Sequence, residues 1–336
     1  MWPQRVGHTP AASDVAPQSK IEAMARLARY SWVVLIYNLA VIAWGAYVRA
    51  TGSGAGCGSH WPLCNGEVVP RAQTVEMLVE FSHRATSGLA LVSVVVLLAW
   101  AWRVTAPGHP VRTGATLSVA FMLSEALLGA GLVLFGLVGK DDSSIRAFVV
   151  SAHLINTFLL LASLTLTVWW AEGGERLSLA GRDGLLRLAV GALAILLVSC
   201  SGAITALGDT LFPSASLGDA LRADVAAGSP VLLRLRTLHP VLAVMTALFL
   251  MTAVWRLAAG RPYGVKMARL LTWLLGVQLL AGMLNVLLLA PVWMQLLHLL
   301  LADIVWIAYL FLGADVLSSP VRAQSAPAST PYATPA

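Results

Sequence analysis

The stretch EFSHRATSGLALVSVVVLLAWAW, residues 80–102, decides the fold, because an apolar run long enough to cross a bilayer follows directly on three polar, ionisable side chains. A helix rises about 1.5 Å per residue, so about 20 apolar residues span the ~30 Å of hydrocarbon in a membrane. Glu80, His83 and Arg84 stand at the start of this run. The stretch predicts a membrane helix whose first turns carry chemically active groups.

Seven further apolar runs of similar length accompany this one. Of the 336 residues, 58% are hydrophobic and 11% are charged, whereas soluble domains average about 25% charged residues. The predicted membrane helices cover residues 32–49, 82–102, 113–137, 147–170, 185–207, 237–257, 268–290 and 292–314. Backbone groups in lipid must be satisfied within their own segment, so the fold class is predicted to be an all-α polytopic membrane protein.

The basic residues are divided unevenly between the connections of these helices. If the amino terminus is cytoplasmic, fourteen Lys and Arg residues fall in inner segments and eight in outer ones, which favours cytoplasmic locations for both termini of a multi-pass plasma-membrane protein. The net charge of +6 is spread over short connections, so membrane lipid rather than nucleic acid is the expected partner. Residues 1–30, on the cytoplasmic side, and residues 316–336 have the composition of disordered tails.

The two halves of the chain resemble each other. SHRATSGLALVSVVVLLAWAWRV (82–104) is similar to LHPVLAVMTALFLMTAVWRLA (238–258), each with His second and Trp-Arg near its end. Each half has an even number of helices, so both halves point the same way through the membrane. The sequence predicts two tandem four-helix bundles, 31–172 and 185–315, related by a pseudo-twofold axis along the membrane normal and joined by a cytoplasmic linker, 173–184.

Four histidines occupy related places in this repeat. His83 aligns with His239 and His153 with His298, and each lies near the outer end of an even-numbered helix. Two imidazoles that face each other across a bundle suit a haem iron, which takes one axial nitrogen from each side. Zinc is the alternative, but apart from Glu80 no further ligand has the spacing to complete a zinc site. The absence of a CxxCH sequence excludes covalent haem attachment.

Four arginines flank helix ends at the level of the histidines, where haem propionates would need cations. They are Arg49, Arg84, Arg234 and Arg236. Interfacial anchoring by snorkelling side chains is the alternative explanation for each of them.

The residues that precede two of the histidines differ between the halves. Glu80 stands three residues before His83, whereas Arg236 stands three residues before His239. A carboxylate beside a haem suits proton transfer to a haem that is being chemically altered, and a cation suits a permanently bound one. The alternative for Glu80 is a favourable interaction of its charge with the helix dipole.

Two acidic residues lie inside predicted membrane helices. A charge at bilayer depth costs about 2.5–3.5 kcal/mol, so Glu125 and Asp303 are expected to face a bundle interior. Glu125 aligns with Gln278 in the repeat, which predicts a shared structural hydrogen bond. Asp303 lies five residues beyond His298.

The predicted outer loop, residues 51–80, begins with the glycine-rich stretch TGSGAGCGSHWPLCNGEVVP (51–70). Cys57 and Cys64 can form a disulfide in that compartment. A static clip is favoured, a redox-active pair stays open, and a metal site with His60 is the weakest option because no fourth ligand follows.

Taken together, GAYVRATGSGAGCGSHWPLCNG (45–66), EFSHR (80–84) and the three later histidines resemble the haem A synthase family over residues 30–315. The resemblance implies oxidation of the C8 methyl group of haem O to a formyl group, giving haem A for cytochrome oxidases, with a haem O synthase as the upstream partner. It implies that His83 and His153 hold the substrate haem O. It also implies that His239 and His298 hold a resident cofactor, haem b, and that Glu80 is the catalytic carboxylate.

Two other functions use the same histidines. A bis-haem b electron-transfer subunit would bind two permanent haems and give Glu80 no chemical task, and a haem transporter or chaperone would bind haem reversibly. One branch of the family often has a second cysteine pair between helices five and six, but residues 208–236 contain none, which favours a structural role for Cys57 and Cys64. The sequence leaves the oligomeric state, a homo-oligomer included, open.

Overall fold

A computed structural model describes residues 12–71, 74–178 and 182–318, and every regular element in these ranges is a helix. Eight of the described helices are long and apolar enough to cross a membrane, which confirms the predicted all-α membrane fold. They are α1 (Ala12–Ala50), α2 (Val75–Val104), α3 (Pro110–Leu134), α4 (Ser144–Ala171), α5 (Arg182–Leu211), α8 (Leu238–Ala258), α9 (Pro262–Leu287) and α10 (Val292–Leu317). Short helices η1 (Ser53–Ala55), α6 (Leu217–Val225) and α7 (Val231–Arg236) lie in connections, and α7 leads into α8 as one apolar span.

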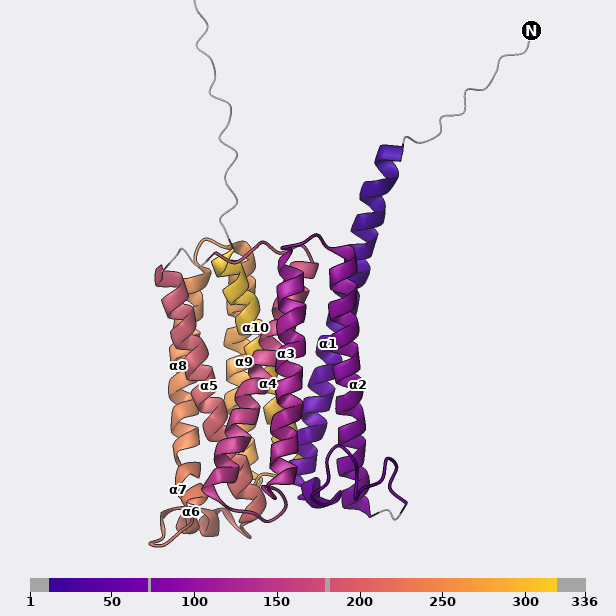
Figure 1. Cartoon of the computed structure of the whole chain (residues 1–336). Coiled ribbons are helices and arrows are strands. Elements are labelled where there is room, and N and C mark those ends of the chain that lie inside the picture. The colour runs from indigo at the N-terminus through magenta and orange to yellow at the C-terminus, as the bar shows by residue number, and fades with distance from the viewer. Residues whose placement is uncertain (1–11, 72–73, 179–181, 319–336) are drawn as a thin grey trace, which may run out of the picture.

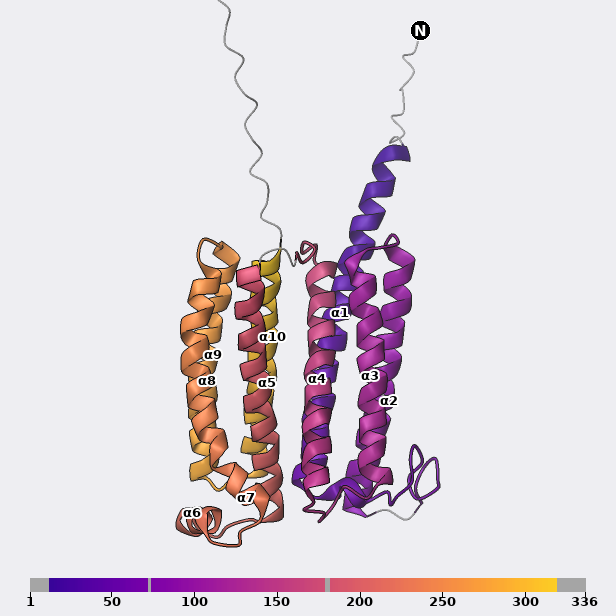
Figure 2. The same cartoon turned by 60° about the vertical axis from the view of Figure 1, so that its left-hand side comes forward.

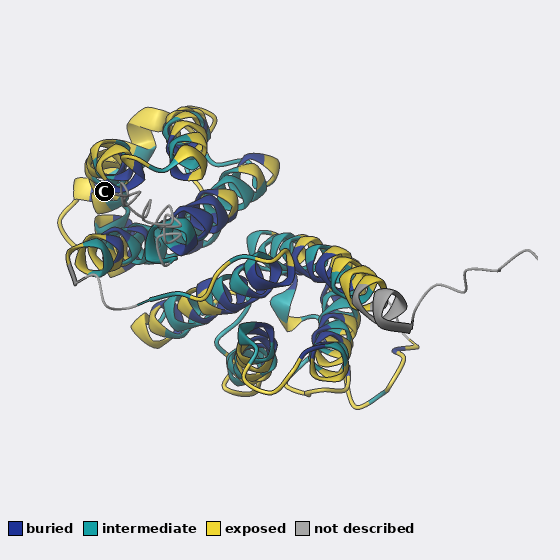
Figure 3. Ribbon diagram, turned by 90° about the horizontal axis from the view of Figure 1, so that it is seen from above, coloured by how far each residue is buried: buried dark blue, intermediate teal, exposed yellow. Residues whose placement is uncertain are grey.

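The long helices gather in two groups that stand side by side. Figure 2 shows α1 to α4 in one group and α5, α8, α9 and α10 in the other, and Figure 3 shows the same division along the helix axes. Contacts between the groups run mainly from α4 to α5 and α10. The indole of Trp306 donates a 2.8 Å hydrogen bond to the carbonyl oxygen of Phe158 and stacks on its ring at 5.4 Å. Many large apolar side chains on the outer surfaces are exposed, such as Leu127 and Trp273, as expected of helices surrounded by lipid.

Local sequence explains where the helices begin. The Thr74 hydroxyl accepts a 3.2 Å hydrogen bond from the Met77 amide at the start of α2, and the Ser143 hydroxyl accepts one of 3.2 Å from the Arg146 amide at the start of α4. Such side chains satisfy amides that have no partner within the helix. Pro110 opens α3, where its missing amide hydrogen costs nothing.

Two boundary predictions were wrong, and one short helix was not predicted. Helix α1 begins at Ala12, so residues 12–30 are helical rather than disordered; helix-forming residues and the 3.3 Å ion pair of Glu22 with Arg26 support this extension. Helix α2 begins at Val75, so the outer loop ends before Glu80. Helix α6 was not predicted, because its moderately polar sequence was assigned to a loop. Of the predicted tails, residues 1–11 and 319–336 lie outside the described residues.

The loop after α1 and the helices α6 and α7 lie at the same end of the molecule (Figure 1), whereas the start of α1 extends beyond the other helices at the opposite end. The buried acidic residue Asp303 has no exposed surface, consistent with the prediction that it faces inward. The end that carries the loop and α6 is also the end toward which the four histidines lie.

Candidate functional site

A cavity of about 1690 Å³ reaches into both helix groups, and His83, His153, His239 and His298 all line it. Pockets for small ligands usually measure about 300–1,000 Å³, so this cavity has room for more than one large, flat ligand. Glu80 lines it as well. The structure therefore brings together the four histidines and the carboxylate that the sequence singles out.

In the second helix group the spacing of two imidazoles fits a metal between them. The ring centroids of His239 and His298 are 6.3 Å apart, and their planes cross at 86°. Two imidazoles that each bind one metal through bonds of about 2.0–2.1 Å have centroids about 6 to 6.5 Å apart. The pair on α8 and α10 thus fits the two axial positions of a haem iron.

Ser201 on α5 selects the nitrogen that His239 offers to the cavity. The Ser201 hydroxyl donates a 2.7 Å hydrogen bond to the carbonyl oxygen of Val198 and lies 2.9 Å from Nδ1 of His239. With its own proton directed to Val198, the Ser201 hydroxyl can accept a hydrogen bond in the tautomer of His239 that carries its proton on Nδ1. The lone pair on Nε2 is then free to bind a metal, as iron ligation requires.

Each of the four histidines lies against a glycine of another helix in its group. A Cβ at Gly45 would lie 2.8 Å from Cε1 of His83, and one at Gly202 or Gly282 would lie 3.0 Å from Cε1 of His239 or His298. A Cβ at Gly129 would lie 4.0 Å from Cε1 of His153. The repeat aligns the glycines in the same pairs as the histidines, and the missing side chains let the imidazoles lie flat against neighbouring backbone. These glycines were not predicted as part of the site, although Gly45 begins the stretch GAYVRATGSGAGCGSHWPLCNG (45–66).

This close contact predicts that Gly45→Ala displaces the His83 ring and weakens haem binding in the first helix group by at least about tenfold, or ~1.4 kcal/mol. Alanine favours helix over glycine, so α1 itself is not expected to unfold. Gly129→Ala is the matched control, because 4.0 Å is an ordinary contact distance. Optical titration of each purified variant with protohaem measures the effect. Equal affinities for the two variants would contradict the assignment of His83.

In the first helix group, Glu80 is a buried carboxylate fixed by two donors. Only 3% of its surface is exposed. Its Oε2 accepts a 2.8 Å hydrogen bond from the amide of Cys57, and its Oε1 lies 2.5 Å from Nη2 of Arg84. Arg84 also donates to the carbonyl oxygens of His60 and Leu63. The outer loop therefore holds the carboxylate in one orientation on the cavity wall.

Cys57 and Cys64 form a disulfide that closes this loop. Both residues are almost completely buried, together with Met77, and their oxidised sulfurs leave no thiolate for a metal site with His60. The described residues contain no cluster of three or more metal-binding side chains, so the zinc alternative lacks a ligand set. Because Cys57 itself donates to Glu80, the disulfide contributes to the position of the carboxylate.

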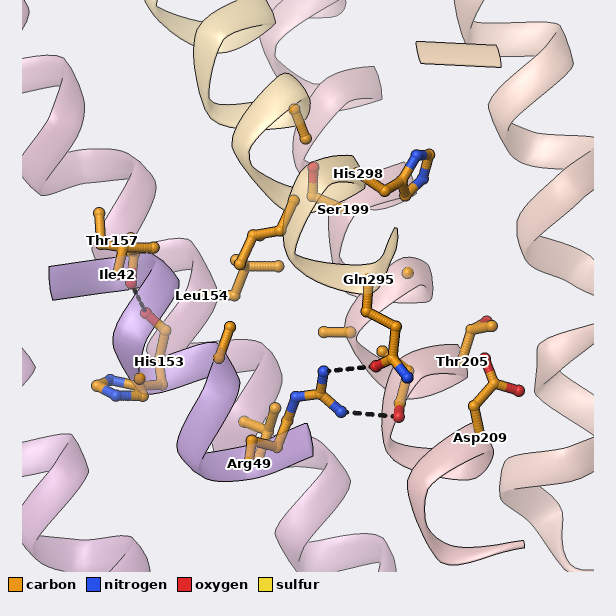
Figure 4. Close-up of a pocket in the computed structure, with 18 of the residues that line it drawn as sticks. Ile42, Arg49, His153, Leu154, Thr157, Ser199, Thr205, Asp209, Gln295 and His298 are labelled. Atoms are coloured by element: carbon orange, nitrogen blue, oxygen red, sulfur yellow. Dashed lines mark hydrogen bonds between the residues drawn. The ribbon is translucent and has the colours of Figure 1, made fainter. Parts of the chain in front are cut away.

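The predicted propionate arginines differ in what their charges already contact. Arg49 reaches from α1 into the second helix group, where it donates to the carbonyl oxygen of Ala206 at 2.7 Å, to Thr210 at 3.0 Å and to Gln295 at 3.0 Å. Figure 4 shows the Arg49 side chain between His153 and His298, with its bond to Gln295 dashed. All three acceptors are neutral, so the charge of Arg49, which lines the cavity, has no carboxylate bonded to it.

Arg236 is not the free cation that the sequence analysis expected beside His239. Its guanidinium lies 2.8 Å from Asp209 and 2.5 Å from Asp224, with all three side chains largely buried. Thr237 between α7 and α8 has right-handed helical dihedral angles, φ −67° and ψ −23°, so the chain keeps a helical course from Arg236 to His239, and the two aspartates rather than the backbone neutralise the predicted cation. Arg234 is exposed and does not line the cavity.

Arg146 is a cavity-lining cation that the sequence analysis missed. Only 4% of its surface is exposed, and its guanidinium donates to the carbonyl oxygens of Gly139 and Asp141. Like Arg49 it bonds to neutral oxygens. The two arginines are therefore the cavity cations best able to neutralise an anionic ligand.

A model of the COX15-CtaA family, described as cytochrome oxidase assembly protein, matches residues 28–310 of this chain. The chain belongs to the COX15-CtaA family. This membership confirms the resemblance to haem A synthases, and the matched range contains all four histidines, Glu80 and the cysteine pair. The family, with its heme A synthase members, implies that haem is involved in the function of the chain.

The individual relatives of this chain carry two different names. The chain is 53% identical over 301 residues to a protein of Thermus thermophilus named protoheme IX farnesyltransferase. The aligned region covers 89% of this chain and 50% of the relative. The chain is 42% identical over 126 residues to the heme A synthase of Halalkalibacterium halodurans, covering 37% of this chain and 41% of that one. The heme A synthase of Geobacillus kaustophilus is 41% identical over 154 residues, covering 44% and 45%. The chain spans about half the length, or less, of these curated relatives.

Proposed function

We propose that this family member is a haem A synthase, an oxidoreductase that converts the C8 methyl group of haem O to a formyl group. The observation that carries the proposal is the placement of Glu80. This buried carboxylate lines the cavity on the same helix as His83, whereas the corresponding Arg236 of the second helix group is neutralised by Asp209 and Asp224. Among the described residues, an acid that lines the cavity from the same helix as one of the four histidines occurs only in the first group.

The proposal gives the two histidine pairs different tasks. His83 and His153 hold haem O as the substrate, and His239 and His298 hold haem b as the resident cofactor. Bound haem b supplies one-electron redox chemistry. The charges of Arg49 and Arg146 face the propionate groups, and the protein orients the substrate so that one edge lies at Glu80.

Glu80 is proposed to act as a proton acceptor. Conversion of a methyl to a formyl group replaces two C–H bonds at one carbon by a C=O bond and removes four electrons, which an external oxidant takes together with supply of the oxygen atom. Protons are released as these C–H bonds break, so a proton acceptor beside that carbon assists the reaction. Arg84 and the Cys57 amide keep the carboxylate in a fixed orientation, and its burial restricts access of bulk water. An oriented base close to the reacting carbon lowers the entropic part of the barrier.

The names of the relatives support haem O as the substrate. One group is named for haem A synthesis and the other for farnesyl transfer to protoheme IX. A farnesylated protohaem is the material that a haem A synthase would oxidise, so we propose a haem O synthase as the partner that supplies it. In the membrane, the histidine-bearing end is proposed to face outward and both termini the cytoplasm.

A bis-haem electron-transfer subunit is the second candidate, because the 6.3 Å spacing of His239 and His298 would serve it equally well. Expression of the chain with and without a supply of haem O, followed by extraction of its haems, separates the two functions. We expect haem A only when haem O is supplied, and haem b in both preparations. Haem b alone in both preparations would contradict the proposed synthase.

A further inference from the structure

The two helix groups differ in the polar residue that lies behind one histidine of each pair. Glu125 on α3 and Gln278 on α9 are equivalent in the repeat, each four residues before the glycine that packs on the histidine. Oε1 of Glu125 lies 3.3 Å from Nδ1 of His153. Gln278 instead donates a 3.1 Å hydrogen bond to the backbone carbonyl of His298 and lies 3.4 Å from its Nε2. The same position thus contacts the imidazole of each group differently.

Glu125 is held firmly by the helix that carries His153. Its Oε2 accepts a hydrogen bond from Asn156 and its Oε1 one from Thr157, both at 2.5 Å. Asn156 is itself fixed, since it donates to the carbonyl oxygen of Phe121 at 2.9 Å and accepts from Ser124 at 2.6 Å. A carboxylate anchored on these sides has little freedom to move away from the imidazole.

The position of this carboxylate suits the orientation of a metal-binding imidazole. Nδ1 of His153 is buried and has no aligned hydrogen bond among the described side chains, and Glu125 is the acidic group that faces it. Contacts of this kind are often long without ligand and tighten when the ligand binds. A carboxylate that accepts the Nδ1 proton fixes the ring and makes Nε2 a stronger donor to a metal.

The corresponding nitrogen in the second group has no such partner. Nδ1 of His298 is buried without a hydrogen bond, and His239 has the neutral hydroxyl of Ser201. An amide nitrogen such as Nε2 of Gln278 cannot accept a proton. The second iron site therefore lacks a carboxylate behind either imidazole among the described residues.

We propose that Glu125 is a positioning residue, which orients His153 through its Nδ1 atom. The haem of the first helix group then has a more strongly donating histidine ligand than the haem of the second. This inference rests on the proposed function for the assignment of His153 as a haem ligand. Stronger donation stabilises the oxidised iron, so the first haem has the lower midpoint potential.

The test compares two full-length proteins, His239→Ala and the double variant His239→Ala with Glu125→Gln. Both are loaded with protohaem. The His239→Ala change removes a ligand of the second site, so the low-spin haem that is measured lies in the first group. We expect Glu125→Gln to retain haem, to move the midpoint potential to a more positive value and to change the low-spin electron paramagnetic resonance spectrum. Glu125→Asp, which keeps the charge, should restore part of the shift. An unchanged potential and spectrum in Glu125→Gln would overturn the proposal.

Gln278→Glu would not copy this arrangement, because Gln278 lies 3.4 Å from Nε2 of His298 and not beside its Nδ1. If Glu125→Gln fails to fold or to hold haem, Glu125→Asp provides the test, because its shorter side chain moves the carboxylate away from Nδ1 of His153, which lies 3.3 Å from Oε1 of Glu125. A Glu125→Asp potential and spectrum equal to those of the background then overturn the proposal. Failure of the natural chain to convert haem O would instead remove the proposed function, while the predicted potential shifts would remain measurable with protohaem.

Discussion

Glu80→Gln is expected to bind both haems and yet to form haem A at least about 100-fold more slowly, because the amide cannot accept a proton released as the C8 methyl group is oxidised. Positioned acid and base groups contribute roughly 10²–10⁴-fold to rates, which sets the expected size. Glutamine keeps one oxygen, which can accept a hydrogen bond from Arg84, and loses the second oxygen, which accepts from the Cys57 amide. The disulfide of Cys57 with Cys64 and the bonds of Arg84 to the carbonyl oxygens of His60 and Leu63 remain, so the outer loop should keep its fold. Extraction of the haems after a timed supply of haem O measures the effect.

A second acid on the same helix provides the control. Glu76 lies in the first turn of α2, is exposed and does not line the cavity, so Glu76→Gln should form haem A at the natural rate. If Glu80→Gln also formed haem A at that rate, Glu80 would be a structural residue of the loop and the proposed base would have to be another group.

His239→Ala is expected to abolish the low-spin spectrum of the resident haem and to lower the haem content of the purified protein. The iron would lose one of its two axial nitrogens, and Ser201 would lose its imidazole partner. The same result is expected for His298→Ala. Optical spectra of the reduced and oxidised protein, with haem extraction, measure the loss.

A histidine far from the cavity provides the comparison. His109 precedes α3, where its ring accepts a 3.3 Å hydrogen bond from the Val111 amide. Asparagine is also a good residue at this position, so His109→Asn should keep the natural spectrum. A natural spectrum in His239→Ala would show that the ligands of the resident haem lie elsewhere.

The fold was predictable because lipid restricts the choice so strongly. Eight apolar runs permit few structures other than eight helices, and the structure has helices at all eight. The helix ends were less predictable, since they depend on short-range contacts in water. The Thr74 cap starts α2 at Val75, and the pair of Glu22 with Arg26 supports α1 far ahead of its apolar run.

The grouping of the four histidines around one cavity was predictable, because the repeat supplied a second copy of each signal. His83 and His239, or His153 and His298, identify one another by alignment, and Gly45 with Gly202 could have been found in the same way. Contacts between distant segments left no such signal. Arg49 meets Gln295 across 246 positions of sequence.

The partners of Arg236 show the same limit. Asp209 and Asp224 were assigned to a helix end and a loop, and only the fold of α6 and α7 brings them to the guanidinium. Local spacing suggested a free cation three residues from His239, whereas tertiary structure neutralises it. The contacts of charged residues in connections are therefore harder to predict from spacing than the positions of histidines within helices.

An experimental structure of the full chain purified with haem O tests the central claim most directly. The account predicts haem O between His83 and His153, with its C8 methyl carbon about 3–3.5 Å from an oxygen of Glu80, and haem b between His239 and His298. Haem O bound in the second helix group, or bound in the first with its C8 methyl group directed away from Glu80, would contradict it.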